Sequence, residues 1–333
     1  MVPRRIVVLG AGAIGGPVAA LLSQHRPPEQ EVIAVARGAH GRAMRDHGLQ
    51  ILRPAPTERT PPVRLPVVAD LSELSPFTDT DLVLLAVMGH HTRDAVAPIP
   101  VDVPIVSLQN GTGPLDELDR DGRPVIAGVV YVPAERRAPG QIALAGAPVP
   151  GAFLLGGWNA GGRAVHDRWG AWLAGQLVAC GFRAEALDSG IASWVLAKVL
   201  GNLAGVVVAL SDDDGTDALS QVLSLAQAEA EAVFAAAGLE WRTPAELAER
   251  IGPLTIEAVD GQPRVGGSTR HALCRGAPLE TAMLHGPILE WGREHGVPTP
   301  VNRRLVALAE RAGAERWTPG GLAPAELLAA VTR

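Results

Sequence analysis

Short apolar runs alternate with helical patterns through the first half of the chain. The runs that predict β-strands are Ile6–Leu9, Glu31–Ala36, Asp81–Val87, Pro104–Leu108, Pro124–Val130, Gln141–Leu144, Ala152–Gly156 and Phe182–Leu187. The pattern predicts helices over Gly15–Gln24 and Arg163–Cys180. Nearly continuous apolar strands separated by crossover segments are typical of a parallel sheet that is buried on both faces.

After Asp188 helical patterns dominate, and no strand-like alternation remains. The predicted helical segments are Gly190–Leu210, Asp217–Ala237, a broken stretch over Pro244–Asp260, Pro278–His295 and Val301–Ala312. A chain of 333 residues is long enough for about two domains. We therefore expect an α/β fold with an N-terminal Rossmann-type dinucleotide-binding domain (1–188) and an all-α C-terminal domain (189–333) that carries substrate and catalytic groups.

Charge and cysteine content narrow the partners and the compartment. The net charge is −6, so no basic face is expected for nucleic acid. Cys180 and Cys274 form neither a disulfide framework nor a metal-spaced pair, which favours the reducing cytoplasm. The apolar run near the N-terminus contains glycines and a proline, unlike the helical core of a signal peptide. No uninterrupted apolar stretch is long enough to predict a membrane span.

Residues 10–15, GAGAIG, match the pattern G-x-G-x-x-G between a predicted strand and a predicted helix. The first glycine permits a tight turn, the second lets the backbone approach a pyrophosphate, and the third allows close packing of helix on strand. The helix N-terminus then binds the anion. We expect a dinucleotide to contact Gly10, Gly12, Ala13, Ile14 and Gly15.

The end of the second strand bears on which dinucleotide binds. NAD sites place an acidic residue there, whereas this chain has Arg37 and no carboxylate. A guanidinium suits a 2′-phosphate, so NADPH/NADP+ is favoured over NAD, the alternative being an ordinary surface arginine. Asn110 follows another strand, at the sheet edge where ligands bind, and is a second cofactor-binding candidate unless it only forms an Asn-Gly turn.

Lys198 is the only lysine among 29 basic residues. Arginine cannot replace lysine where a proton must leave, so Lys198 is a candidate acid unless it is a chance survivor on the surface. It lies in an apolar predicted helix, with Trp194 one turn before it and Asn202 one turn after it on the same face. Burial would bring an ammonium pKa toward the range useful for acid–base chemistry.

Three other residues are candidates for chemistry. Glu280, at the start of a predicted helix, is either a site carboxylate or a residue that stabilises the helix dipole. His90 and His91 are adjacent, and on an extended backbone such side chains point apart, so no metal site is expected.

Taken in order, these motifs resemble the ketopantoate reductase (2-dehydropantoate 2-reductase) family over nearly the whole chain. The segments that carry the resemblance are the glycine motif, 36–38, the strand DLVLLAV, 109–113, 138–142, Lys198 with Asn202, Ser268, Glu280 and 295–302. The resemblance implies that Lys198 donates a proton to the ketone oxygen while NADPH delivers hydride. It also implies that Asn110 contacts the cofactor.

The resemblance assigns roles to three further residues. Asn202 would place Lys198 or the substrate, Ser268 would bind the substrate carboxylate, and Glu280 would order the site. The chain also departs from the family. Apolar residues stand where the family usually has polar ones, at Met88, Val206, Val265, Ala272 and Ala282.

The favoured interpretation is an NADPH-dependent reductase of a 2-keto acid or related carbonyl compound. An imine reductase or alcohol dehydrogenase on the same fold is one alternative, and a non-catalytic NADP-binding sensor is another. The expected partner is a small carbonyl substrate rather than nucleic acid or a membrane, and a homodimer is the candidate assembly.

Overall fold

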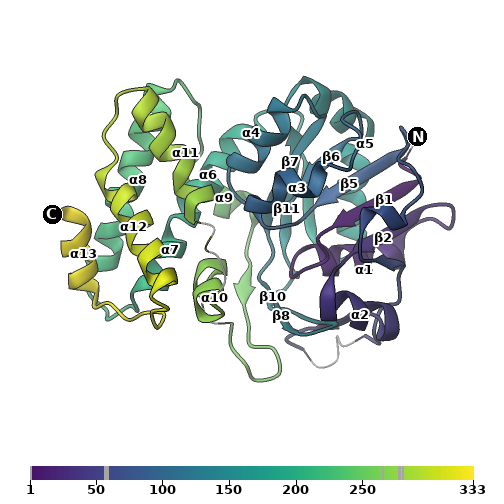
Figure 1. Ribbon diagram of the computed structural model, residues 1–333, viewed down its shortest axis with the longest axis horizontal. Helices are drawn as coiled ribbons and strands as arrows, with labels where there is room; N and C mark the ends of the chain where they lie inside the picture. Colours follow the sequence, from purple (N-terminus) through teal and green to yellow (C-terminus); the bar gives the residue numbers. More distant parts are fainter. Residues whose placement is uncertain (1, 56–59, 265, 277–278, 280) are drawn as a thin grey trace. The chain divides into compact units, whose positions relative to one another are not determined.

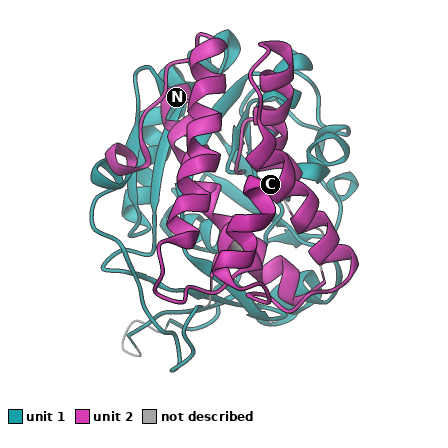
Figure 2. Cartoon of the chain, turned by 90° about the vertical axis from the view of Figure 1, so that its left-hand side faces the viewer, with its two compact units in different colours: residues 1–109, 114–191, 248–264 teal, residues 110–113, 192–247, 265–333 magenta. Residues whose placement is uncertain are grey.

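A computed structural model describes residues 2–55, 60–264, 266–276, 279 and 281–333 (Figure 1). The chain divides into two compact units, coloured separately in Figure 2. Unit 1 comprises 1–109, 114–191 and 248–264, and unit 2 comprises 110–113, 192–247 and 265–333. The sequence placed 248–264 after a single boundary at residue 188, whereas the structure packs this segment within unit 1. The functional division at 188 stays a prediction.

The main sheet of unit 1 has eight strands in its described part. In spatial order they are β12 (Arg183–Ala186), β11 (Ala152–Gly157), β7 (Val125–Tyr131), β6 (Ile105–Ser107), β5 (Asp81–Leu85), β1 (Arg5–Leu9), β2 (Glu31–Val35) and β4 (Val67–Val68). All residues of β1 and β5 are buried, as continuous apolar strands require. The α/β class with a parallel-strand domain is therefore confirmed.

Three strands differ from the expected parallel set. β11 runs antiparallel to β7, and β12 runs parallel to β11, so both are opposite in direction to the other strands of the main sheet. The predicted strand Gln141–Leu144 forms (β9), but it pairs with β3 (Gln50–Leu52) and β8 (Ala134–Ala138) in a separate sheet. An apolar run shows that a strand is buried, and the pattern does not specify its partner.

A short strand also forms where none was expected. β13 (Thr255–Ile256) pairs antiparallel with β10 (Gly146–Ala147), so the expectation of no strand after Asp188 is wrong. Two exposed residues are too few to produce a visible alternation. Arg183 Nη1 donates to the Ile251 carbonyl oxygen at 2.6 Å and holds the neighbouring segment in unit 1.

Helices and short 3₁₀ turns connect the strands of unit 1. The helices are α1 (Gly15–His25), α2 (Gly38–His47), α3 (Thr92–Val96), α4 (Gly113–Arg120) and α5 (Ala160–Ala179), and the 3₁₀ turns are η2 (Leu71–Glu73) and η3 (Gly89–His91). α5 packs against β7, β11 and β12, and α1 packs against β1 and β2. The strand–turn–helix order expected around the glycine motif is present.

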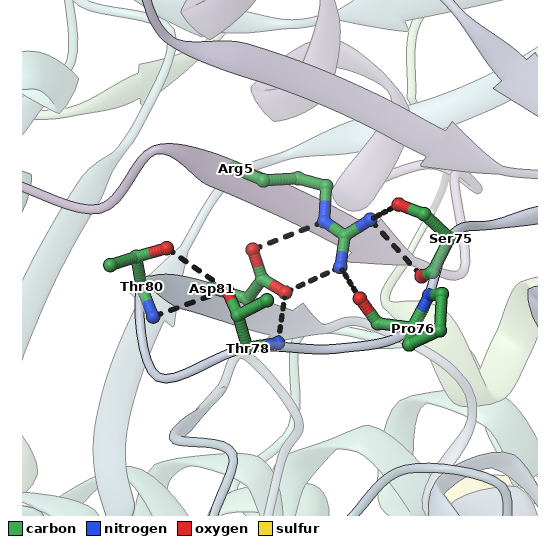
Figure 3. A network of polar contacts seen from close by, with 6 residues as sticks. All are labelled: Arg5, Ser75, Pro76, Thr78, Thr80 and Asp81. Carbon is green, nitrogen blue, oxygen red and sulfur yellow. Dashed lines mark hydrogen bonds and ion pairs between the residues drawn. The ribbon is translucent and has the colours of Figure 1, made fainter.

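A buried ion pair joins the amino ends of β1 and β5 (Figure 3). Arg5 is 7% exposed and Asp81 is 2% exposed, and the guanidinium contacts both carboxylate oxygens. Arg5 also donates to Ser75 Oγ at 2.6 Å and to the Pro76 carbonyl oxygen at 3.0 Å. Thr78 N donates to Asp81 at 2.7 Å. This network fixes the edge of the sheet opposite to the carboxyl ends of its parallel strands.

Unit 2 is helical in its described residues. Its helices are α6 (Ile191–Asn202), α7 (Ala204–Leu210), α8 (Ala218–Ala236), α10 (Ser268–Cys274), α11 (Thr281–Glu294), α12 (Pro300–Ala314) and α13 (Pro324–Thr332), while α9 (Pro244–Ile251) runs from one unit into the other. Its core centres on Phe234, whose ring contacts Trp241 and Trp291 edge-on. The helical character expected for the C-terminal domain is thus confirmed for unit 2, while β13, within the predicted range 189–333, belongs to unit 1.

Helices α6 and α7 together cover Ile191–Leu210, which is long and apolar enough to cross a membrane by length and composition alone. Half of its most apolar window is buried inside the protein, and the two helices meet at Leu203. An apolar helix buried by its neighbours is typical of a protein core, and we assign this pair to the core of unit 2.

Candidate active site

The register of unit 1 brings the predicted ligand-binding turns to one sheet edge. Leu9 pairs with both Val35 and Leu85, and Leu85 pairs with Ser107. All these strands are parallel, so the segments that follow them lie along their common carboxyl edge. Open α/β sheets bind ligands at this edge.

The three glycines of the motif have the three expected environments. Gly10 has a φ of +98°, and a Cβ there would lie 2.8 Å from Val87 Cγ1. A Cβ at Gly15 would lie 2.4 Å from the Gly10 carbonyl oxygen, so only glycine permits this close packing of helix on strand. A Cβ at Gly12 would have no described atom within 4 Å, which leaves its backbone open to a ligand.

The N-terminus of α1 supplies backbone donors beside this turn. Ile14 occupies the N-cap position, and its side chain cannot accept a hydrogen bond from the helix. The first turn contains no acidic side chain that would oppose an anion. Ala13 and Ile14 are half-buried. The open Gly12 backbone and this helix end fit the pyrophosphate of a dinucleotide.

Arg37 is exposed and forms the N-cap of α2, directly after β2. Asp70 lies near enough for the Arg37 charge to act on it. The pKa of Asp70 is lowered mainly by hydrogen bonds from Ser72 and, more weakly, by Arg37. The sequence interpretation found no carboxylate at the end of β2, and Asp70 reaches this region from the segment after β4. It could not be identified from spacing along the second strand.

Gln109 ties the ends of two strands together. Its side-chain nitrogen donates to Thr92 Oγ1 at 2.8 Å and to the Val87 carbonyl oxygen at 3.1 Å, while Ser107 Oγ donates to its oxygen at 3.1 Å. With its side chain fully engaged, Gln109 has a structural role. It fixes the direction in which the chain enters Asn110.

The structure brings Asn110 and Asn202 together within unit 2. Asn202 Nδ2 donates to Asn110 Oδ1 at 3.3 Å. The adjacent Gly111 has a φ of +85°, and a Cβ there would lie 2.7 Å from the Met283 carbonyl oxygen in α11. The turn therefore packs closely against the first part of α11, and glycine is required for this approach.

Lys198 is half-buried in α6, one helical turn before Asn202. Trp194, one turn earlier, is also half-buried, and the Arg242 guanidinium lies 5.6 Å from its ring centroid. Arg242 N donates to the Ser193 carbonyl oxygen at 3.1 Å. This bond holds the segment between α8 and α9, which contains Arg242, against the start of α6. Trp194, Lys198 and Asn202 thus form one stripe of the helix.

Helix α10 packs against α7 in the same unit. Arg270 donates to the Val208 carbonyl oxygen at 2.8 Å and to Asp212 at 2.6 Å. Ser268 is the first residue of α10, while Val206 and Ala272 are both buried. This packing sets where α10 begins relative to the helix pair that carries Lys198.

The remaining residues singled out in the sequence contribute less to this site. Glu280 and Val265 lie outside the described residues. Ala282 is exposed, and Met88 is 39% exposed. His90 and His91 lie on η3 rather than on an extended backbone, and their ring centroids are 4.1 Å apart. The expectation that these two side chains point apart is therefore wrong.

Sequence reasoning missed His40, which is buried on α2. Its Nε2 lies 2.9 Å from the Ala11 carbonyl oxygen in the glycine motif, and Gly140 N donates to its Nδ1 at 3.0 Å. A single polar residue in a short amphipathic helix gives no sequence signal of such contacts. Its partner Gly140 lies in the segment 138–142, which the sequence singles out only through the family resemblance.

Comparisons with known proteins cover both halves of the chain. The family model described as "Ketopantoate reductase PanE/ApbA" matches residues 6–160, and "Ketopantoate reductase PanE/ApbA C terminal" matches residues 195–312. The 2-dehydropantoate 2-reductase of Mesorhizobium japonicum is 31% identical, over 94% of this chain and 98% of the relative. That of Halobacterium salinarum is 28% identical, over 93% and 100%.

Solved structures show the same architecture. The ketopantoate reductase of Ralstonia eutropha JMP134 superposes with a TM-score of 0.73 at 26% identity, covering 94% of this chain and 99% of the other. A D-mandelate dehydrogenase solved with NADH and anilino(oxo)acetate has a TM-score of 0.74 at 20% identity, covering 94% and 99%. At that identity the second likeness concerns the fold alone.

Proposed function

Because the chain belongs to the ketopantoate reductase family, we propose that it reduces the carbonyl group of a 2-keto acid or related compound to an alcohol. NADPH is the proposed hydride donor, and Lys198 is the proposed proton donor. The glycine-rich turn with the N-terminus of α1 would hold the pyrophosphate, and Arg37 would bind the 2′-phosphate.

The observation that carries the proposal is the Asn202–Asn110 hydrogen bond. Asn110 follows a strand at the ligand-binding edge, which makes it a cofactor-binding candidate. Asn202 lies one helical turn from the only lysine in the sequence. Two separate lines of sequence reasoning therefore meet at one pair of side chains in unit 2.

The proposed reduction needs a hydride donor, a proton donor and groups that hold the substrate. When bound, NADPH supplies a hydride to the carbonyl carbon. Negative charge then builds on the carbonyl oxygen, and the Lys198 ammonium would neutralise it and donate the proton. Asn202, one turn further along α6, would orient Lys198 or the substrate. Ser268 is the proposed partner of the substrate carboxylate, and Glu280 the residue that orders the site.

The replaced polar positions bear on the substrate. Val206 and Ala272 are 2% and 5% exposed, on two helices that pack together. A buried apolar side chain cannot pair with a substrate hydroxyl group. We propose that the natural substrate carries an apolar group near its carbonyl.

The test measures NADPH oxidation against a panel of 2-keto acids, simple ketones and cyclic imines, with Lys198→Ala as the control. Turnover of a keto acid that disappears in the variant supports the proposal. Turnover of imines alone would favour the imine reductase alternative. NADPH binding without turnover of any compound would favour the sensor, and the carbonyl reductase proposal would then be wrong.

A further inference from the structure

His40 joins the glycine-rich turn to a segment about 100 residues away in sequence. It is 6% exposed on α2 and lies between the Ala11 carbonyl oxygen and the backbone N–H of Gly140. Gly140 has a φ of +72° and accepts a hydrogen bond from Gln50 N at 2.8 Å, so its own position is fixed by the small sheet. The ring thus bridges two well-held pieces of backbone.

These partners determine the tautomer of His40. The Gly140 N–H can only donate, so Nδ1 must be unprotonated and accept. The Ala11 carbonyl oxygen can only accept, so Nε2 must carry the proton. Only the neutral ring satisfies both contacts. Consistently, burial lowers the pKa of His40, and the charge of Arg136 on β8 acts in the same direction.

The contact with Ala11 controls the peptide that leads into Gly12. A planar trans peptide points its carbonyl oxygen and the next N–H in opposite directions. Ala11 N donates to the Val35 carbonyl oxygen at 3.0 Å, and His40 holds the Ala11 oxygen, so both sides of Ala11 are fixed. The Gly12 N–H donates to the Gly10 carbonyl oxygen at 2.7 Å, so this bond and the contact with His40 hold the Ala11–Gly12 peptide from its two sides.

We propose that His40 is a positioning residue for dinucleotide binding, which holds the Ala11–Gly12 peptide and with it the shape of the glycine-rich turn that receives the pyrophosphate. This inference rests on the proposed function, because it assumes that the glycine-rich turn binds a dinucleotide. His40 itself need not touch the ligand. Its effect passes through one backbone peptide.

Because only the neutral ring can accept from Gly140, the contact between His40 and Gly140 is sensitive to acid. A proton on Nδ1 would place two donors face to face at Gly140, and that contact would be lost. The glycine-rich turn and residues 139–142 carry no charged side chain that could compensate. Arg136 on β8, and Arg37 three residues earlier at the start of α2, have the same sign as the protonated ring. Dinucleotide affinity should therefore fall as the solution is acidified through the lowered pKa of this ring.

The experiment compares three substitutions in the full chain. His40→Phe removes both hydrogen bonds, whereas His40→Gln offers an acceptor and a donor on one planar amide that does not titrate. His166→Phe is the matched control, because His166 is also 6% exposed in unit 1 and lies on α5. Fluorescence titrations would give the Kd values of NADPH and NADH from pH 8 to 5.5, and saturating assays would give kcat.

We expect His40→Phe to raise both Kd values roughly 10- to 30-fold, the effect of losing two hydrogen bonds, with kcat at saturation within about twofold of wild type. His40→Gln should recover most of the affinity, and its affinity should stay flat with pH while that of wild type falls. His166→Phe should leave both Kd values unchanged.

Wild-type affinity in His40→Phe, or an equal loss in His166→Phe, would overturn this proposal alone. An acid-induced loss of affinity in His40→Gln as large as that of wild type would also overturn it. This comparison can still be made if the Phe variant does not fold. A wild-type protein that binds neither dinucleotide would instead overturn the proposed function.

Discussion

An ammonium group that serves as a general acid must be able to lose its proton, and Lys198 is the only lysine in the chain. We expect Lys198→Ala to lower kcat by roughly 10² to 10⁴, the usual share of general acid catalysis, with little change in NADPH affinity. Lys198→Arg should be almost as slow, because guanidinium does not deprotonate. Steady-state kinetics and NADPH titration of both variants test this. If the arginine variant keeps most of its activity, Lys198 supplies charge only.

The cofactor preference is a second question at the scale of single residues. Arg37→Asp should weaken NADPH binding roughly 10- to 100-fold, because a charge-assisted hydrogen bond becomes a repulsion. NADH binding should change much less, since NADH lacks the 2′-phosphate. Titration of both dinucleotides into wild type and variant provides the measurement. Tighter binding of NADH than of NADPH by wild type would contradict the prediction.

Asp70 offers a matched variant for the same test. Its carboxylate lies near enough to Arg37 to be affected by it, and both side chains are exposed. Asp70→Asn should strengthen NADPH binding slightly, and added salt should weaken this effect because exposed charges are screened. An unchanged Kd at low salt would show that Asp70 serves only to cap η2.

At the scale of elements, one buried histidine links three helices of unit 2. His285 on α11 contacts Asn302 Oδ1 on α12 at 2.9 Å, and Asn302 Nδ2 donates to the Ala226 carbonyl oxygen of α8 at 2.9 Å. The Asn302 oxygen must then accept from His285 Nδ1, which leaves Nε2 unprotonated. No described residue hydrogen-bonds to Nε2. Burial lowers the pKa of His285 to about 4.

This shift predicts acid destabilisation. The unfolded chain protonates His285 near pH 6.5, whereas the folded protein resists protonation until about pH 4. The unfolded state binds more protons between these values, so the free energy of unfolding falls as the pH drops through this window, by about 3 kcal/mol from this group. Above pH 6.5 the group has no such effect.

His285→Asn isolates this contribution, because asparagine can keep the donor to Asn302 but does not titrate. Urea unfolding at pH 7 and pH 4.5 gives the free energies for both proteins. We expect wild type to lose more stability on acidification than the variant. An equal loss in the two proteins would assign the acid sensitivity to other groups.

The elements that local pattern defines were predictable, and those that depend on distant partners were not. β1, the turn at Gly10 and α1 follow from an apolar run, three glycines and a helical pattern, all within Arg5–His25. By contrast, β9 forms as predicted but pairs in another sheet, because its partner β3 lies about 90 residues earlier. β13 is set by β10 and by Arg183, neither of which its own two residues reveal.

The same distinction holds for the site. Asn202 follows Lys198 by one helical turn, so spacing alone places both on one stripe. That Asn110 meets Asn202 depends on the packing of residues 110–113 against α11, which spacing does not encode. His40 and Asp70 escaped prediction for this reason, since each acts on a turn from a separate segment.

At the scale of the whole molecule the open question is the substrate. Ketopantoate is small and rich in oxygen, so a site that binds it must pair its carboxylate, keto and hydroxyl groups. The chain has apolar residues at positions where the family usually has polar ones, and the structure buries two of them, Val206 and Ala272. Each substrate polar group left unpaired in a dry pocket costs about 1 to 3 kcal/mol.

We therefore expect ketopantoate to be a poor substrate, because losing even two partners lowers kcat/KM by a factor of roughly 10² to 10⁴ at about 1.4 kcal/mol per decade. A bulkier, less polar 2-keto acid has fewer polar groups to leave unpaired, and each Å² of its own apolar surface that the site buries contributes about 25 cal/mol. Steady-state kinetics with ketopantoate and with branched and aromatic 2-keto acids decide between them. A kcat/KM for ketopantoate above roughly 10⁴ M⁻¹s⁻¹, an ordinary value for a native substrate, would mean that other residues of the chain supply the missing polar partners.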